Sequence, residues 1–273
     1  MLEHADQIIS GARIIEKVLG IERVMIGIED NKPDAVEAMR KACEKYAEFS
    51  VTALKTKYPQ GGEKQLVYAL TGRTVKMGGL PLDVGAVVCN VGTCHALCRA
   101  AYEGRPIVDR VVTVGGCVQN PANYLVRIGT PVEWLLDTSK GLLPETKMLI
   151  YGGPMMGIAQ HTLEVGIIKG TNAVLCLTRK EAAPIETEEV CLRCARCVNV
   201  CPMHLTPVYM HLYAGKGMWK EAEALNVMDC IECGSCNYIC PGRLHLVQSF
   251  RMTKMELRQL AAKEKAAKEA AKA

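Results

Sequence analysis

Aromatic residues and long apolar runs are scarce in this 273-residue sequence. Aromatics make up only 5% of it against 49% hydrophobic residues, so aliphatic side chains must form most of any core. No run of about 18 apolar residues occurs, so we expect no membrane-spanning helix. No secretory signal is visible either. The 14 cysteines therefore predict a reducing compartment and bound metal rather than disulfides.

A strong charge of one sign is also missing. The formal net charge is +4, and residues 251–273 contain seven Lys and Arg against three Glu, which accounts for the whole excess. The rest of the chain lacks the basic footprint of a nucleic-acid-binding protein, so we expect no nucleic-acid partner.

Two cysteine runs share the pattern Cys-x-x-Cys-x-x-Cys-x-x-x-Cys-Pro. In such runs three thiolates from a tight loop bind one 4Fe–4S cluster, and the fourth cysteine binds the other cluster. We therefore predict one cluster on Cys191, Cys194, Cys197 and Cys240. The second is predicted on Cys230, Cys233, Cys236 and Cys201. Small residues in the loops leave room for backbone N–H groups to approach the sulfurs: Ala195, Gly234 and Ser235.

Zinc and disulfides are the alternatives for these cysteines. Structural zinc typically uses paired Cys-x-x-Cys knuckles with four ligands in all. Disulfides require an oxidising compartment. Two complete runs of three plus one cysteines, each followed by proline, favour clusters over both alternatives.

The first hundred residues predict an α/β layer. A helix with one apolar face ends at Gly20, and short apolar strands at 23–30 and 50–55 flank a helix at 35–46. Strand, helix and strand at this spacing favour a parallel sheet. Residues 85–89 predict another strand, and Thr93 is the expected N-cap of the helix that follows.

The remainder predicts a strand-rich module, a charged linker at 180–189 and a mostly helical cysteine domain. Helices are expected at 208–214 and 219–225, and a last helix from Leu246. The apolar stripe of that last helix is interrupted by Lys254. From Ala261 the sequence contains only Ala, Lys and Glu, which predicts a solvated tail.

Several motifs occur in a characteristic order: KYPQGGEKQL at 57–66, NVGT at 90–93, RVVTV at 110–114, GGPMMG at 152–157, and the two cysteine runs. Together they resemble the RnfC family, whose members are subunits of the Rnf complex, the membrane-bound ferredoxin:NAD oxidoreductase that pumps sodium or protons. The resemblance extends from Leu2 to about Leu257. The family is also distantly similar to the flavoprotein subunit of respiratory complex I.

The resemblance implies a fold of four parts. These are a partial FMN/NADH-binding α/β domain (1–106), a β-grasp, SLBB-like module (107–179), an α-helical ferredoxin-like domain with two 4Fe–4S clusters (180–260), and a charged tail (261–273). In the family, two loops border the flavin, which implies flavin contacts from Gly61, Gly62, Glu63, Asn90 and Thr93. No side chain is expected to act as a catalytic acid, base or nucleophile.

The resemblance also implies an electron-transfer role. The chain is expected to relay electrons between an NADH/FMN site and the clusters, with other Rnf subunits as partners, and ferredoxin and NADH as indirect ones. The expected location is the cytoplasmic face of the cell membrane, without a transmembrane segment. Two alternatives stay open: a soluble carrier that serves a cytosolic reductase, and a scaffold whose clusters are structural.

The start of the chain departs from the family. Full-length members begin upstream, with a glycine-rich loop that cradles FMN and NADH. We therefore expect this chain to be N-terminally truncated or part of a split subunit, and to bind FMN weakly by itself.

Further cysteines lie outside the two runs. Cys94 and Cys98 fall on one helical face, with His95 between them and Cys89 upstream. Two interpretations stand: buried thiols that pack as small hydrophobic groups, and a redox-active pair or metal ligands near the flavin wall. We predict plain core positions for the other three: Cys43, Cys117 and Cys176.

Overall fold

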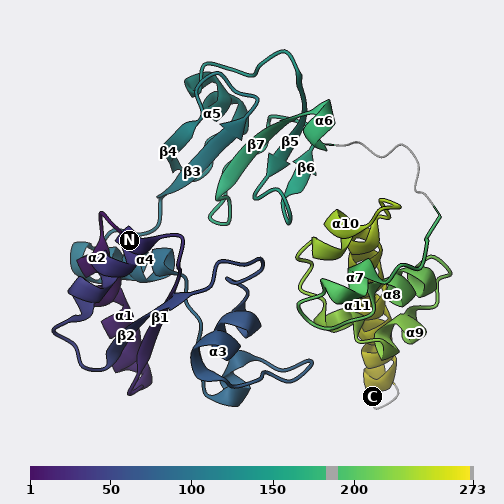
Figure 1. Cartoon of the computed structure of the whole chain (residues 1–273), viewed down its shortest axis with the longest axis horizontal. Coiled ribbons are helices and arrows are strands. Elements are labelled where there is room, and N and C mark those ends of the chain that lie inside the picture. The colour runs from purple at the N-terminus through teal and green to yellow at the C-terminus, as the bar shows by residue number, and fades with distance from the viewer. Residues whose placement is uncertain (183–189, 271–273) are drawn as a thin grey trace. The chain divides into compact units, whose positions relative to one another are not determined.

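The computed structural model describes residues 1–182 and 190–270 and forms two compact units, Met1–Ile107 and Val108–Ala273 (Figure 1). Most of the predicted charged linker, at 183–189, lies outside the described residues. The first unit has one buried apolar cluster, and the second unit has two.

The first unit contains a two-stranded parallel sheet with helices packed beside it. Strands β1 (Val24–Glu29) and β2 (Phe49–Leu54) pair in parallel, which confirms the predicted parallel sheet. The helices are α1 (Ala5–Leu19), α2 (Pro33–Cys43), α3 (Glu63–Thr71) and α4 (Val91–Glu103). A short 3-10 turn, η1 (Pro81–Val84), lies between α3 and α4.

Helices α1 and α4 approach each other closely because α1 carries a glycine at the contact. A Cβ atom on Gly11 would lie only 1.8 Å from the backbone oxygen of Cys94. The apolar residues Ile8, Ile9 and Ala12 of α1 are buried beside it, as their spacing predicts. Leu19, which follows the same helical spacing, is 49% exposed because it lies at the end of the helix.

Two predictions for residues 85–93 are wrong. Residues 85–89 form no strand in the described structure, and Val87 is half exposed. The N-cap of α4 is Asn90 rather than Thr93, because the helix already begins at Val91 and the Asn90 side chain accepts a hydrogen bond from the Gly92 N–H at 2.8 Å.

The second unit begins with a five-stranded mixed sheet in the order β4-β3-β7-β5-β6. Its strands are β3 (Asp109–Gly116), β4 (Ala122–Arg127), β5 (Thr146–Tyr151), β6 (Ile158–Gln160) and β7 (Ala173–Thr178). Only β3 and β7 pair in parallel, and helix α5 (Val132–Thr138) adds its buried residues to the same core. The short strand β6 was not predicted.

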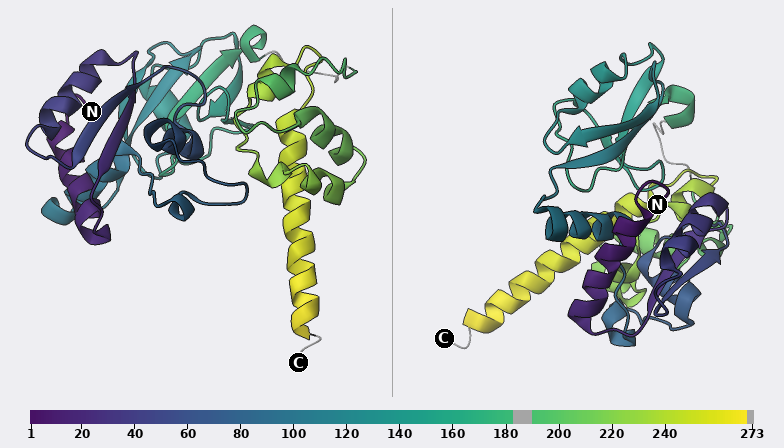
Figure 2. Two further views of the ribbon diagram at one scale, coloured as in Figure 1. Left: turned by 60° about the horizontal axis from the view of Figure 1, so that its bottom comes forward. Right: turned by 90° about the vertical axis from the view of Figure 1, so that its left-hand side faces the viewer.

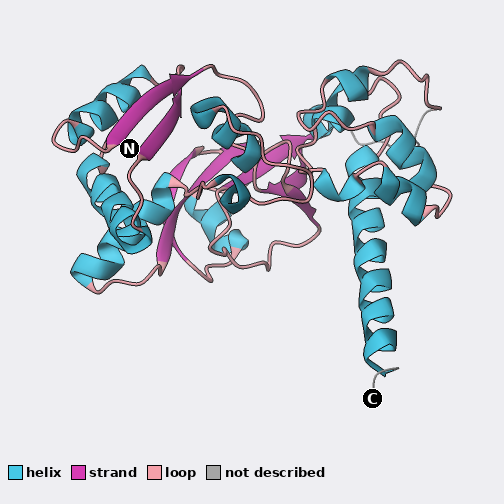
Figure 3. Ribbon diagram, turned by 90° about the horizontal axis from the view of Figure 1, so that it is seen from below, coloured by secondary structure: helices cyan, strands magenta, loops and turns pink. Residues whose placement is uncertain are grey.

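The cysteine-rich part of this unit is helical, and Figure 3 shows only helices and loops there. Helix α6 (Arg179–Ala182) directly follows β7 and contacts the sheet instead. The elements of the cysteine-rich part are α7 (Arg196–Asn199), α8 (Pro207–Ala214), α9 (Trp219–Ala224), η2 (Val227–Asp229), α10 (Ser235–Ile239) and α11 (Leu246–Ala270). Phe250, Met210 and Val227 are almost fully buried in its core.

Helix α11 differs along its length. Its first half contributes buried residues such as Leu246, Phe250 and Leu257, whereas residues 261–270 are exposed and extend beyond the other helices of the cysteine-rich part (Figure 2). None of the described helices combines the length and apolarity needed to cross a membrane.

Candidate metal centres

A first cavity, with about 390 Å³ of empty space, opens among the helices of the second unit. Four cysteines line it: Cys191, Cys194, Cys197 and Cys240. Two belong to the loop before α7, one lies in α7 and one directly follows α10. Apolar residues complete the wall, among them Val208, Leu244 and Leu246.

A second cavity, of about 340 Å³, is built in the same way. Its four cysteines are Cys201, Cys230, Cys233 and Cys236. Their apolar surroundings come from the loop before α8, from α8 itself and from α11: Met203, Leu205, Met210, Val247 and Phe250.

Each cavity therefore combines three cysteines of one run with the last cysteine of the other run. Cys201 follows Cys197 by four positions and precedes Cys230 by 29, yet it lines the cavity of the distant run. Cys240 shows the reciprocal placement. Helices α8 and α9 and the turn η2 form the segment that connects Cys201 to Cys230, and therefore connects one cysteine run to the other.

Left-handed backbone conformations turn the two loops around their cavities. Arg193 (φ 52°) and Glu232 (φ 55°) occupy the same position in their runs, as do Ala195 (φ 58°) and Gly234 (φ 83°). The turns direct N–H groups at sulfur, and the Glu232 N–H donates to Cys230 Sγ at 3.4 Å. Such hydrogen bonds stabilise a thiolate ligand and influence the potential of a cluster.

Burial raises the pKa of several of these thiols. It acts together with the neighbouring thiols of Cys230 and Cys233 to raise the pKa of Cys236 to about 12. Burial also raises the pKa of Cys197 and that of Cys230, although the Glu232 N–H and the Lys254 ammonium oppose it at Cys230. Without a cationic group to bind, these side chains remain thiols at neutral pH, so binding a metal group would release protons.

The spacing of the side chains bears on the type of group that fits. Within residues 1–182 and 190–270, no three His, Cys, Asp or Glu side chains converge closely enough to hold a single metal ion. A zinc ion needs its sulfurs about 2.3 Å from one centre. Four thiols spread around a mainly apolar cavity instead fit a larger thiolate-bound group, as a 4Fe–4S cluster is.

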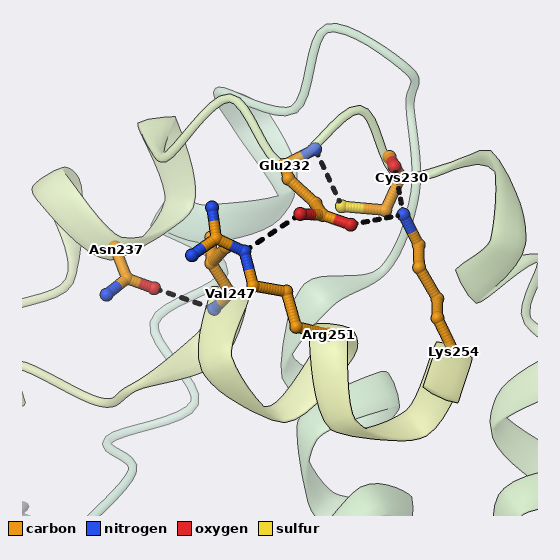
Figure 4. Close-up of polar contacts among 6 residues, drawn as sticks. All are labelled: Cys230, Glu232, Asn237, Val247, Arg251 and Lys254. Carbon is orange, nitrogen blue, oxygen red and sulfur yellow. Dashed lines mark hydrogen bonds and ion pairs between the residues drawn. The ribbon is translucent and has the colours of Figure 1, made fainter. Parts of the chain in front are cut away.

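Beside the second cavity lies a charged cluster that was not predicted, formed by Lys254, Glu232 and Arg251 (Figure 4). Lys254 Nζ donates to Glu232 Oε1 at 2.8 Å and to the backbone oxygen of Cys230 at 2.6 Å. Arg251 Nε donates to Glu232 Oε2, also at 2.8 Å. Burial raises the pKa of Glu232, but the hydrogen bonds and charges of Lys254 and Arg251 outweigh it, so the pKa lies below its ordinary value.

The predicted flavin residues lie at the starts of two helices of the first unit. Gly61 and Gly62 directly precede α3, which begins at Glu63, and Asn90 caps α4, which contains Thr93. The backbone N–H groups at a helix start attract anions. Next to Gly61, the side chain of Gln60 is buried, and among the described residues none bonds its Oε1 atom.

The cysteines of α4 are packed like small apolar side chains. Cys94 and Cys98 are 7% and 6% exposed, and burial raises the pKa of both thiols, whereas Cys89 is exposed. His95 Nε2 donates a hydrogen bond to Gln7 Oε1 at 2.9 Å. Cys43 and Cys176 are buried as predicted, and Cys117 is partly buried.

Comparison with protein families identifies three domains in order. Residues 1–99 match the Nuo51 FMN-binding domain, residues 111–159 the SLBB domain, and residues 183–241 the 4Fe-4S dicluster domain. These matches confirm the predicted fold class.

Curated relatives align with nearly the whole chain. It is 48% identical over 268 residues to the C subunit of the proton-translocating ferredoxin:NAD(+) oxidoreductase complex of Clostridium ljungdahlii, covering 97% of this chain and 58% of the relative. It is 44% identical to the Na(+)-translocating counterpart of Acetobacterium woodii, covering 94% and 58%. It is 40% identical to the C subunit of the ion-translocating oxidoreductase complex of Erwinia tasmaniensis, and the alignment covers 95% of this chain and 32% of that relative.

The chain thus spans less than two thirds of the length of these relatives. Among solved structures, an NAD+-reducing nickel–iron hydrogenase in the H2-reduced state superposes with a TM-score of 0.56, covering 92% of this chain and 52% of the other. Because the identity is 14%, this likeness concerns the fold alone.

Proposed function

Because nearly the whole of this chain is homologous to part of the C subunit of the ion-translocating ferredoxin:NAD(+) oxidoreductase complexes, we propose that it is an electron-transfer subunit of such a complex. It relays electrons between an NADH/FMN site and two 4Fe–4S clusters. The observation that carries the proposal is the pair of cavities, each lined by four cysteines from both runs.

The ligands proposed for the clusters follow the two cavities. The first set is Cys191, Cys194, Cys197 and Cys240, and the second is Cys201, Cys230, Cys233 and Cys236. Bound clusters supply one-electron transfer. The chain contributes thiolate ligands, apolar walls that limit water, and backbone N–H groups directed at sulfur, such as those of Leu205 and Glu232.

For the flavin we propose contacts from the two helix starts of the first unit. The N–H groups around Gly61, Gly62 and Glu63 suit an anionic phosphate, and the turn from Asn90 to Thr93 is the second flavin contact that we propose. The match of residues 1–99 to an FMN-binding domain supports this assignment. NADH would then reduce the flavin.

The proposal extends to domain limits, partners and location. The proposed domains are 1–106, 107–179 and 180–260, followed by a charged tail at 261–273. Other subunits of the complex are the direct partners. The ultimate donor and acceptor are either reduced ferredoxin and NAD+, or NADH and oxidised ferredoxin. The chain would lie at the cytoplasmic face of the membrane, attached through those subunits.

The test is reduction of the reconstituted chain by NADH. The chain of 273 residues is loaded anaerobically with iron and sulfide, and cluster reduction is followed by EPR with and without added FMN. A Cys194→Ala/Cys233→Ala variant, which lacks a ligand in each cavity, is the control for adventitious iron. We expect about eight iron atoms and eight sulfides per chain.

Reduction of both clusters by NADH when FMN is present would support the relay. Because weak flavin binding is expected, FMN is supplied in large excess. Clusters that dithionite reduces but that NADH with excess FMN does not reduce would favour a structural scaffold. Co-purification with membrane subunits distinguishes a component of the complex from a soluble carrier. Stoichiometric zinc, or only four iron atoms, would contradict the ligand assignment.

A further inference from the structure

The second cavity has a buried positive charge beside it. Lys254 is only 7% exposed, although lysine side chains are almost never buried unless they are paired. It lies on the inner face of α11, one turn after Phe250, which lines the cavity. Its Nζ atom donates to the backbone oxygen of Cys230, a residue of the cavity wall, at 2.6 Å.

One carboxylate is shared between this lysine and a neighbouring arginine. Glu232 receives Lys254 on Oε1 and Arg251 on Oε2, both at 2.8 Å. Figure 4 shows both cations reaching from α11 toward the Cys230 loop. The three side chains carry two positive charges and one negative charge, so a net positive charge remains beside the cavity.

The first cavity has a different charge environment. Glu232 occupies the position in its run that Arg193 occupies in the other run, and both have a left-handed backbone. Arg193 and Arg196 are exposed, so solvent and salt screen their charges. Lys254 is shielded from solvent, so its charge acts more strongly over the same distance.

We propose, building on the function assigned above, that Lys254 raises the reduction potential of the cluster held by Cys201, Cys230, Cys233 and Cys236, with Glu232 as its counter-ion. Reduction adds one electron to the cluster, changing its charge with four thiolates from about −2 to about −3, with no proton transferred and no bond broken. A fixed cation nearby stabilises the more negative state.

Lys254 does not line the cavity, so it is a positioning residue rather than a ligand. The same contacts would also serve a purely structural role, because Lys254 joins α11 to the Cys230 loop. The two roles differ in one respect: a structural role predicts that losing either partner loosens the loop in the same way. An electrostatic role predicts opposite effects on the potential.

The experiment is a redox titration of the reconstituted full chain, with dithionite as reductant and EPR as the readout. In Lys254→Met, one of the two potentials should become more negative. In Glu232→Gln, which frees both cations, the same potential should become less negative. The double variant removes one charge of each sign and should return toward the original value. Lys254→Arg keeps the charge and should shift the potential least.

Two controls identify the cluster and the origin of the shift. Lys263→Met removes an equal but exposed charge from the same helix and should move neither potential. The signal that shifts in the Lys254 variant should be the one that is absent in Cys233→Ala.

Shifts of the same sign in Lys254→Met and Glu232→Gln, or unchanged potentials in both, would overturn the proposal. If Lys254→Met fails to retain its cluster, Glu232→Gln and the double variant still decide the sign. Wild-type protein that binds no clusters would contradict the proposed function itself, whereas two clusters with unmoved potentials would contradict only the role of Lys254.

Discussion

Exchange of the last cysteine between the two runs can be tested by counting iron in paired variants. Cys201 lines the cavity of Cys230, Cys233 and Cys236, and its removal leaves that cavity with three thiols. Cys201→Ala should therefore lose one cluster of the two, about four iron atoms of eight. Alanine is preferable to serine because a serine oxygen can replace sulfur as a ligand.

The informative step is the second substitution. If Cys201 serves the second cluster, adding Cys233→Ala removes another ligand of a cluster already lost, so iron should remain at about four atoms per chain. Adding Cys194→Ala instead should reduce iron to near zero. Ligation within each run predicts the reverse result for the two double variants.

Iron and sulfide analysis, with the number of EPR signals as an independent readout, measures this directly. Cys89→Ala is the matched control, because Cys89 is exposed and lines neither cavity. It should retain all the iron. A Cys201→Ala/Cys233→Ala protein without iron, beside a Cys201→Ala/Cys194→Ala protein with one cluster, would refute the exchange.

Three further outcomes are expected. Phe250→Ala, at a side chain 1% exposed, should destabilise the cluster-loaded domain by about 3–5 kcal/mol in anaerobic denaturant titrations, and a change below about 1 kcal/mol would contradict its core role. Burial, with the neighbouring thiol of Cys117, raises the pKa of Cys176 to about 11. The Cys176 thiol should therefore stay protonated and resist iodoacetamide at pH 8, whereas the exposed Cys89 should react. Peptide mass mapping measures the labelling of both, and equal labelling would contradict this expectation. Deleting residues from Ala261 onward should leave iron content and assembly with partner subunits intact, because residues 261–270 are exposed and lack large apolar side chains; release from membranes that retain the partner subunits would identify the tail as an anchor.

The parts of the structure that follow from local spacing could be predicted from the sequence. The parallel strands of the first unit and the helices between the cysteine runs are examples, because each depends on a short apolar or turn pattern. The strand predicted at 85–89 was wrong, because an apolar run forms a strand only where another strand can pair with it. Strand β6 was missed because its three residues are too few to show the alternation of apolar and polar side chains that indicates a strand.

Lys254 shows a different limit. In sequence it looks like an interruption of the apolar stripe of α11, and its partner Glu232 lies 22 positions earlier. Only the packing of α11 against the Cys230 loop brings the two charges together. A signal was nevertheless present, since a lysine within a buried stripe requires a nearby acid, and Glu232 stands between two cysteines of a run.

The crossing of the two runs also limits the order in which the protein can mature. During synthesis the first three cysteines, up to Cys197, emerge early, but their cavity is not complete until Cys240 has been added. Cys201 likewise has no partner until the chain reaches Cys230, and its set of four is complete only at Cys236. A ribosome must therefore translate most of the domain before either centre can close, and the ligands of the second centre are complete four residues before those of the first.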